Sequence, residues 1–219
     1  MYRGRIIACI TNRRLVKGDF FAQIERVAAM EMVDWIIVRE KDLRVEEYRT
    51  LFAKVARIAH KGGKKCLAHG RIALGMMSEL GANGLHLPLD ALREWRAASG
   101  WRSAPQAGAV QIVGASAHSA SELAEAAALG ADYATLSPIF ATACKPGVAP
   151  LGTAALAAAC QKSPIPIFAL GGIGMDKLDA CIEAGAAGCC MMSELMRCIY
   201  SIRAVPLGLE FLKVHGTIK

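Results

Sequence analysis

The chain has 219 residues, of which 54% are hydrophobic and 21% are charged, a balance that excludes an intrinsically disordered protein and allows one large buried core. Its formal net charge is +7, but no basic run is interleaved with aromatic residues, which argues against nucleic acid as a partner and favours a small anion. The longest apolar stretches are shorter than the roughly 20 residues needed to cross a bilayer, so we expect no membrane partner.

Short apolar or β-branched runs alternate with Ala-, Leu- and Glu-rich stretches along the whole chain. That order predicts parallel strands joined by helical crossovers, and about eight such units close a (β/α)8 barrel. We expect residues 1–219 to form a single TIM-barrel domain. The strands are expected at Arg5–Ile10, Trp35–Arg39, Lys65–His69, Gly84–Leu87, Gln111–Ser116, Tyr133–Ser137, Ile165–Leu170 and Ala187–Met192.

The segments between the strands carry signals that begin and end helices. Ser119 or Ser121 is expected to cap the helix after the fifth strand. Gly130 and Gly185 each follow an Ala/Leu-rich stretch and suit a left-handed position just past a helix end. Residues 201–219 are expected to form a C-terminal tail whose apolar side chains pack under the barrel or against a second subunit, which leaves a homodimer open.

Eight cysteines lie mostly within apolar runs, without the paired spacing of a zinc site or of a small secreted scaffold. We therefore expect reduced thiols and a cytoplasmic protein. Cys181, Cys189, Cys190 and Cys198 are close enough in sequence to suggest a metal cluster. Buried core positions are the favoured interpretation, because free cysteine is among the most buried residue types.

Residues 169–174 predict a strand that runs into a glycine-rich turn before a helix. Gly171 and Gly172 would let backbone N–H groups approach a phosphate, although an ordinary tight turn is the alternative. The next predicted strand ends at Met192 and is followed by Ser193, and barrels often bind one phosphate between their last two loops. The two loops together favour a phosphate site.

His118 follows the fifth predicted strand, two residues after Ser116, at the end of the barrel where such enzymes place their catalytic groups. An imidazole can transfer a proton near neutral pH, but a lone histidine is more often structural or a surface cap. His86 alternates with apolar residues on the fourth predicted strand, so we expect it to be a hydrogen-bonded interior residue.

Cationic side chains follow two other predicted strands. Arg39 and Lys41 flank Glu40, which suggests either a solvated ion pair or a pair of cations that hold an anionic substrate. The loop after the sixth strand is either an ordinary loop or part of the site, and Cys144 lacks the adjacent base that a nucleophile needs. This loop carries a hydroxyl, a thiol and an ammonium group, in Thr142, Cys144 and Lys145.

Taken in order, these motifs resemble the thiamin phosphate synthase and TenI superfamily over nearly the full chain. The resemblance implies a (β/α)8 barrel that binds a thiazole phosphate. The matching segments are Arg39-Glu40-Lys41, Gly84-Leu85-His86-Leu87, Gly114-x-Ser116-x-His118, Ala131-Asp132-Tyr133, Pro138-Ile139-Phe140-x-Thr142-x-Cys144-Lys145 and Gly171-Gly172-Ile173.

The superfamily has two main activities. In synthases, a pyrimidine diphosphate loses pyrophosphate and the thiazole nitrogen attacks the resulting carbocation, with Mg2+ held by two aspartates. In the TenI branch, a metal-free tautomerase moves a proton to aromatise a carboxylated thiazole phosphate. The catalytic histidine of that branch matches His118, although synthases often carry a histidine there too.

Several residues depart from the synthase pattern. His69 stands where synthases have Asn, Gly70 stands where they have one metal-binding Asp, and Asp90 is one residue early for the other. A single displaced carboxylate is a poor Mg2+ site, because this ion needs near-octahedral oxygen coordination. Gly70, Leu87-Pro88 and Cys144-Lys145 instead follow the TenI pattern.

The favoured hypothesis from the sequence is therefore a TenI-like thiazole tautomerase that uses His118 as acid and base and needs no cofactor. The alternatives are a thiamin phosphate synthase, in which Asp90 helps to hold Mg2+, and a non-catalytic protein that only binds thiazole phosphate. The residues expected to contact the substrate or its phosphate are Arg39, Lys41, His69, Ser116, Thr142, Cys144, Lys145, Gly171, Gly172, Met192 and Ser193.

Overall fold

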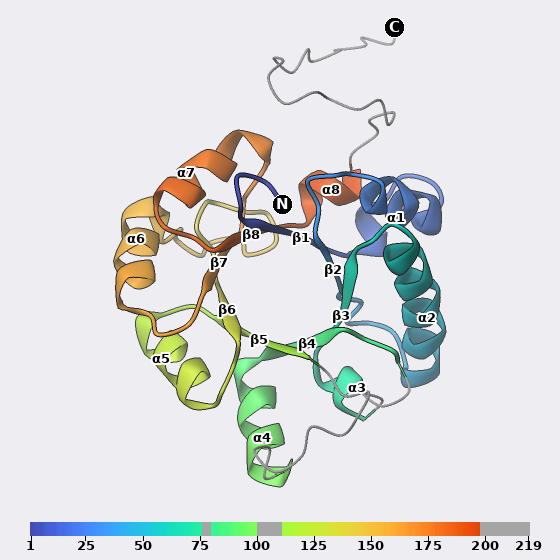
Figure 1. The fold of residues 1–219 in the computed structure, drawn as a ribbon, viewed down its shortest axis with the longest axis horizontal. Helices are drawn as coiled ribbons and strands as arrows, with labels where there is room; N and C mark the ends of the chain where they lie inside the picture. The colour runs from blue at the N-terminus through green and yellow to red at the C-terminus, as the bar shows by residue number, and fades with distance from the viewer. Residues whose placement is uncertain (76–79, 100–110, 198–219) are drawn as a thin grey trace, which may run out of the picture.

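The computed structural model of the chain describes residues 1–75, 80–99 and 111–197. These residues form a closed barrel of parallel strands, β1 to β8 in the order of the sequence, and the helices surround it (Figure 1). The barrel closes between β1 and β8, where Ile7 pairs with Cys189 and Ala8 with Cys190. The (β/α)8 barrel predicted from the sequence is confirmed.

Each strand lies within two residues of its predicted bounds. The strands are β1 (Ile6–Ile10), β2 (Trp35–Val38), β3 (Lys65–His69), β4 (Gly84–Pro88), β5 (Ile112–Ala117), β6 (Tyr133–Leu136), β7 (Ile167–Leu170) and β8 (Gly188–Met191). The helices are α1 (Phe20–Ala28), α2 (Val45–Lys61), α3 (Arg71–Leu74), α4 (Leu89–Ser99), α5 (Ala120–Ala128), α6 (Gly152–Lys162), α7 (Leu178–Glu183) and α8 (Ser193–Arg197), with short 3-10 helices η1 (Arg13–Leu15) and η3 (Met175–Lys177).

The predicted helix caps are present. The side chain of Ser119 accepts the N–H of Glu122 at the start of α5. Gly130 and Gly185 follow α5 and α7 with φ values of 76° and 92°, in the left-handed region that glycine adopts readily. The tail predicted at 201–219 lies outside the described residues. No helix among the residues described is long and apolar enough to cross a membrane.

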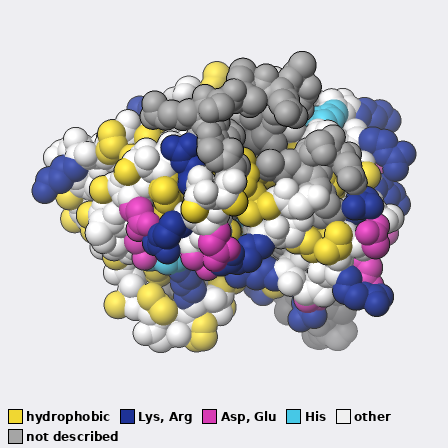
Figure 2. All heavy atoms as spheres, turned by 90° about the horizontal axis from the view of Figure 1, so that it is seen from below, with side chains coloured by type: hydrophobic (Ala, Val, Ile, Leu, Met, Phe, Trp, Pro, Cys, Tyr) yellow, Lys and Arg dark blue, Asp and Glu magenta, His cyan; other side chains and the backbone are white. Residues whose placement is uncertain are grey.

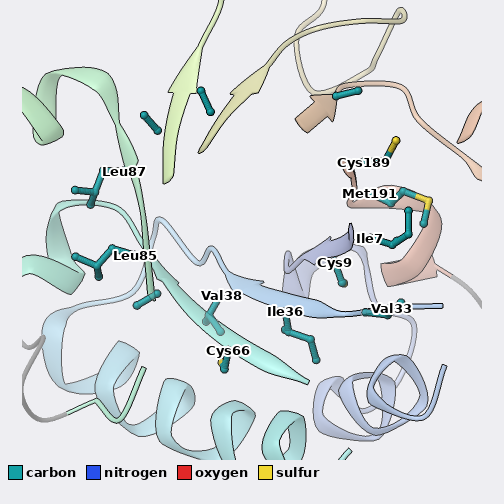
Figure 3. Close-up of a cluster of buried hydrophobic side chains, with 14 of the residues drawn as sticks. Ile7, Cys9, Val33, Ile36, Val38, Cys66, Leu85, Leu87, Cys189 and Met191 are labelled. Carbon is teal, nitrogen blue, oxygen red and sulfur yellow. The ribbon is translucent and has the colours of Figure 1, made fainter. Parts of the chain in front are cut away.

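Alternate strand residues face the surrounding helices or the barrel interior, because side chains along a strand point to opposite faces. Those that face the helices form one continuous core with buried helix residues. Figure 3 shows ten of these side chains around the strands: Ile7, Cys9, Val33, Ile36, Val38, Cys66, Leu85, Leu87, Cys189 and Met191. This core holds the helices against the barrel.

The barrel interior is apolar near the amino ends of its strands and polar towards their carboxyl ends. Trp35 and Tyr133, each the first residue of its strand, pack against Phe168 with ring centroids 5.3 and 4.6 Å away. His69 and His86 are buried further along β3 and β4. Because aromatic rings fill the amino end, a polar ligand can approach only from the carboxyl end.

The cysteines are largely core residues, as expected. Cys181 and Cys189 are buried in the core under the helices, and Cys190 is buried in the barrel interior. The part of the chain that the structure describes contains no group of three or more side chains able to share a metal ion, and Cys198 lies outside it.

Candidate active site at the carboxyl end of the barrel

The two cations that follow β2 are not paired with the acid between them. Glu40 is buried, and its carboxylate accepts the Thr11 hydroxyl at 2.8 Å and the Arg13 N–H at 3.0 Å. The Arg13 guanidinium also lies 3.0 Å from this carboxylate. Over the described ranges, Arg39 and Lys41 form no ion pair, so the ion-pair interpretation of this motif is wrong. Glu40 is already bound by groups that follow β1.

Three cations from two loops lie near one another. Repulsion by Arg39 lowers the pKa of Lys41, with a further contribution from burial. The pKa of Lys145 is lowered by burial and by Lys41 and Arg39, while Glu122 acts in the opposite direction. Burial also lowers the pKa of Arg39. An anion placed between these groups would relieve their mutual repulsion, so the cluster favours a negatively charged ligand.

His118 lies at the same end of the barrel, just after β5. Its Nδ1 is 2.8 Å from the carbonyl oxygen of Ser137, which can only accept, so Nδ1 carries a hydrogen and donates it. Lys145 Nζ lies 3.1 Å from Nδ1 and 3.4 Å from Nε2, and it donates to the Ser137 hydroxyl at 3.4 Å. Because Nδ1 donates to the Ser137 carbonyl, Nε2 and this hydroxyl are the acceptors left for the ammonium group. The backbone N–H of His118 donates to Glu122 at 2.7 Å. The imidazole therefore holds the Lys145 ammonium group beside the barrel mouth.

His86 is the hydrogen-bonded interior residue that the sequence predicts. Its Nδ1 lies 2.9 Å from the Tyr133 hydroxyl, and its Nε2 lies 3.0 Å from the hydroxyl of Ser116. Burial, together with repulsion by Arg39, lowers the pKa of His86 to about 4. Ser116 thus forms a hydrogen bond with a neutral interior histidine, on the side of the site that faces the barrel interior.

His69, the last residue of β3, stacks on His86 with ring centroids 5.6 Å apart. Its backbone N–H donates to the Tyr48 hydroxyl at 3.0 Å, whereas its ring makes no hydrogen bond to any other described residue. Only 9% of the residue is exposed. Burial lowers its pKa well below the ordinary value, and His86, Arg39 and Lys41 lower it further. A neutral imidazole that is not hydrogen-bonded to any other described residue therefore borders the cationic cluster.

The glycine turn after β7 packs against the loop that carries Lys145. Gly171 and Gly172 have φ values of 100° and 64°, and the Gly171 carbonyl accepts the Phe140 N–H at 3.0 Å. A Cβ atom at Gly172 would overlap the Ala141 carbonyl oxygen and lie 2.9 Å from Phe140 Cβ. These glycines are required for loop packing as well as for any approach to phosphate.

The loops after β7 and β8 adjoin each other. A Cβ atom at Gly174 would lie 3.5 Å from Glu194 Oε2, one residue past Ser193. Within the described segments, the N–H groups of Gly172, Ile173 and Ser193 donate to no protein acceptor. Unused N–H groups on neighbouring loops are the donors that a phosphate requires. The geometry is therefore compatible with the predicted phosphate site.

The remaining predicted residues surround these groups. Thr142 accepts the Cys144 N–H through its hydroxyl at 3.3 Å and the Lys145 N–H through its carbonyl at 3.1 Å. This turn directs Lys145 back towards His118. The Cys144 thiol is exposed, and Met192 packs against the interior cluster of the barrel.

Within ranges 1–75, 80–99 and 111–197, the residues near the carboxyl end do not fit a Mg2+ site. Asp90 lies in the first turn of α4, where its carboxylate accepts the Ala91 N–H at 2.8 Å and pairs with Arg71 at 2.7 Å. These two interactions lower its pKa, and Arg71 also pairs with Glu94. Gly70 offers no ligand. On the face of the molecule that carries α4, acidic side chains lie next to basic ones (Figure 2).

Comparison with known proteins identifies the family. A family model described as thiamine monophosphate synthase matches residues 7–195. The chain is 31% identical over 188 residues to the thiamine-phosphate synthase of Syntrophomonas wolfei, covering 85% of this chain and 86% of that protein. It is 30% identical over 192 residues to the thiamine-phosphate synthase of Salinibacter ruber, covering 85% and 79%.

A solved structure supports the fold. The thiamine phosphate pyrophosphorylase from Pyrococcus furiosus has a TM-score of 0.73 to this chain, with 21% sequence identity, and the match covers 90% of this chain and 89% of that one. At this identity the likeness shows the fold alone.

The prediction that the chain is a TenI-like tautomerase is wrong, because these relatives, which match most of this chain, are named thiamine-phosphate synthases. The prediction rested on residues near the site that follow the TenI pattern instead of the synthase pattern, namely Gly70, Leu87-Pro88 and Cys144-Lys145. Such differences do not identify the reaction, because they do not show which bond the enzyme forms. Since the family model matches most of the sequence, the chain belongs to the thiamine monophosphate synthase family.

Proposed function

We propose that the chain is a thiamine-phosphate synthase, which joins a thiazole phosphate to a pyrimidine that carries a diphosphate and releases pyrophosphate. The observation that carries this proposal is the cluster of Arg39, Lys41 and Lys145, which has no carboxylate partner among the described residues. A leaving pyrophosphate carries several negative charges, and Arg and Lys are the side chains that bind phosphate oxygens most strongly.

The proposed reaction exchanges one bond for another. The bond between carbon and the diphosphate oxygen breaks, and its electron pair leaves with the pyrophosphate. The lone pair of the thiazole nitrogen then forms a bond to that carbon. No proton transfer is needed, so the contribution of the protein is to stabilise the charge that develops on the leaving oxygen and to hold the two rings together.

We assign the two anionic groups to two places at the barrel mouth. The thiazole monophosphate is proposed to bind the N–H groups of Gly172, Ile173 and Ser193, and the diphosphate is proposed to lie at the cationic cluster. One loop reaches both places, because it packs on Gly172 through Ala141 and also carries Lys145. The side chains proposed to line the space between the two anions are Ser116, Thr142, Cys144 and Met192, with the Gly171 backbone at its edge.

His118 is proposed to be a positioning residue rather than the acid and base. Its ring lies against the Lys145 ammonium group, 3.1 Å away at Nδ1 and 3.4 Å at Nε2, while the Ser137 carbonyl fixes its orientation at Nδ1. Its effect on the reaction would therefore be exerted through Lys145. This role accounts for a histidine in a reaction that moves no proton.

The proposal is tested by incubating the protein with both substrates and Mg2+ and measuring pyrophosphate and thiamine phosphate. Equal amounts of the two products are expected, and only when both substrates are present. Lys145→Ala should lower kcat by about 10²–10³-fold, as expected when one group that stabilises developing charge is removed. Lys162→Ala, at the exposed end of α6, is the matched control and should leave kcat unchanged. Absence of coupled product formation would overturn the proposal.

In the same assay, His118→Gln should lower kcat by about 5–10-fold and raise KM for the diphosphate substrate by a similar factor, a smaller loss of kcat than in Lys145→Ala, because only the placement of Lys145 is weakened. A fall in kcat of about a thousandfold with KM unchanged would contradict the positioning role.

A further inference from the structure

The carboxylates near the cationic cluster are already bound to other protein groups. Each accepts hydrogen bonds or forms ion pairs with a neighbour, which leaves no free pair of acidic oxygens to coordinate a divalent ion among the residues that the structure describes. These carboxylates and their partners are Glu40 with Thr11 and Arg13, Asp42 with Arg13 and Arg14, Asp90 with Arg71, and Glu122 with the His118 N–H.

The charge at the barrel mouth also disfavours a bound cation. Repulsion by Arg39 lowers the pKa of Lys41, and the pKa of Lys145 is lowered mainly by burial, with smaller contributions from Lys41 and Arg39. A divalent ion held by the protein beside them would add repulsion, whereas a diphosphate would remove it. The site is therefore built to bind an anion directly.

His69 supplies a further group for the same anion. It is nine-tenths buried, its ring makes no hydrogen bond to another described residue, and it interacts electrostatically with Arg39 and Lys41. A neutral imidazole can donate one hydrogen bond from a ring nitrogen to a phosphate oxygen. The residue after it, Gly70, has no side chain that could coordinate a metal there.

We infer that this chain binds the diphosphate of its substrate without a metal ion held by the protein: Arg39, Lys41, Lys145 and the ring of His69 bind the anion directly, and Arg71 keeps Asp90 outside the site. The inference rests on the proposed function, because it names how the diphosphate of that reaction is recognised. Any Mg2+ that takes part would have to arrive with the substrate.

The test is isothermal titration of the full chain with inorganic pyrophosphate, once in EDTA and once in Mg2+. We expect binding in EDTA, with a Kd no more than about threefold weaker than in Mg2+. Lys145→Ala and His69→Leu should each weaken binding in EDTA by about tenfold or more, because each removes a group that donates to a charged oxygen. His69→Asn keeps a donor and should lose less, and Asp90→Asn should bind as the wild type does.

Thermal melting and titration with thiazole phosphate show whether each variant is folded. Binding of pyrophosphate only in the presence of Mg2+, or loss of that binding in Asp90→Asn, would overturn the inference. Pyrophosphate binding in EDTA without any product from the two substrates would instead overturn the proposed function, so the two failures can be distinguished.

Discussion

His86 and His118 have different roles because their surroundings differ. His86 is buried and held by Tyr133 and Ser116, whereas His118 is exposed and contacts Lys145. The sequence predicted the interior location of His86 from its alternation with apolar residues. It did not predict that His118 would be oriented by Ser137, because that contact joins residues from different strands.

The buried histidine makes stability depend on pH. Its pKa is about 4 in the folded chain and 6.5 ordinarily, so the unfolded chain binds the extra proton first as the pH falls. The contribution of His86 is therefore complete above pH 6.5 and decreases between pH 6.5 and 4, by at most about 3 kcal/mol. Urea unfolding at several pH values measures it.

His86→Gln is the comparison for this prediction, because it keeps a polar side chain that does not titrate. The free energy of unfolding of the variant should fall less steeply between pH 6.5 and 4 than that of the wild type. Identical slopes in the two proteins would show that His86 does not carry the dependence.

At the residue scale, the sequence placed Arg39, Lys41 and Lys145 at the correct end of the barrel, and of its two interpretations of the Arg39-Glu40-Lys41 motif the ion pair was wrong. Thr11 and Arg13 follow β1, and only closure of the β1–β2 pair brings them to Glu40. Sequence proximity favoured an ion pair between neighbours. Barrel topology determined the actual contact.

At the scale of elements, the loop between β6 and α6 and the glycine turn after β7 form one unit. The Ile139 N–H donates to the Leu170 carbonyl at 2.9 Å, and the Lys177 ammonium group donates to the Gly172 carbonyl at 2.9 Å. The glycine motif predicted the turn, but the sequence did not show that the turn supports the Lys145 loop. Lys177 was missed altogether, because a lysine in a loop carries no distinctive spacing.

Gly172→Ala should destabilise the protein by about 1–3 kcal/mol, because it combines a left-handed backbone with overlap of the Ala141 carbonyl. It should also raise KM for thiazole phosphate. Gly147→Ala is the matched control, since Gly147 has a φ of 78° and its Cβ would meet nothing within 4 Å. Equal losses of unfolding free energy in the two variants would contradict the packing account.

At the scale of the whole molecule, the strand and helix pattern was sufficient to predict the closed barrel, because it repeats along the whole chain. The reaction could not be predicted in the same way. Residues at a few positions of the site suggested a tautomerase. The family model and the relatives that match most of the chain are instead named as thiamine phosphate synthases. A barrel fixes where a ligand binds, since aromatic rings close one end, but it does not fix which bond is made.

The proposed reaction requires two separate anion sites at the carboxyl end of the barrel, on either side of the space where the rings meet. A crystal structure of the protein with thiazole phosphate and pyrophosphate tests it most directly. We predict the monophosphate at the N–H groups of Gly172 and Ser193, and the pyrophosphate in contact with Arg39, Lys41 and Lys145. Both anions at one of these places, or either anion away from the barrel mouth, would contradict the account.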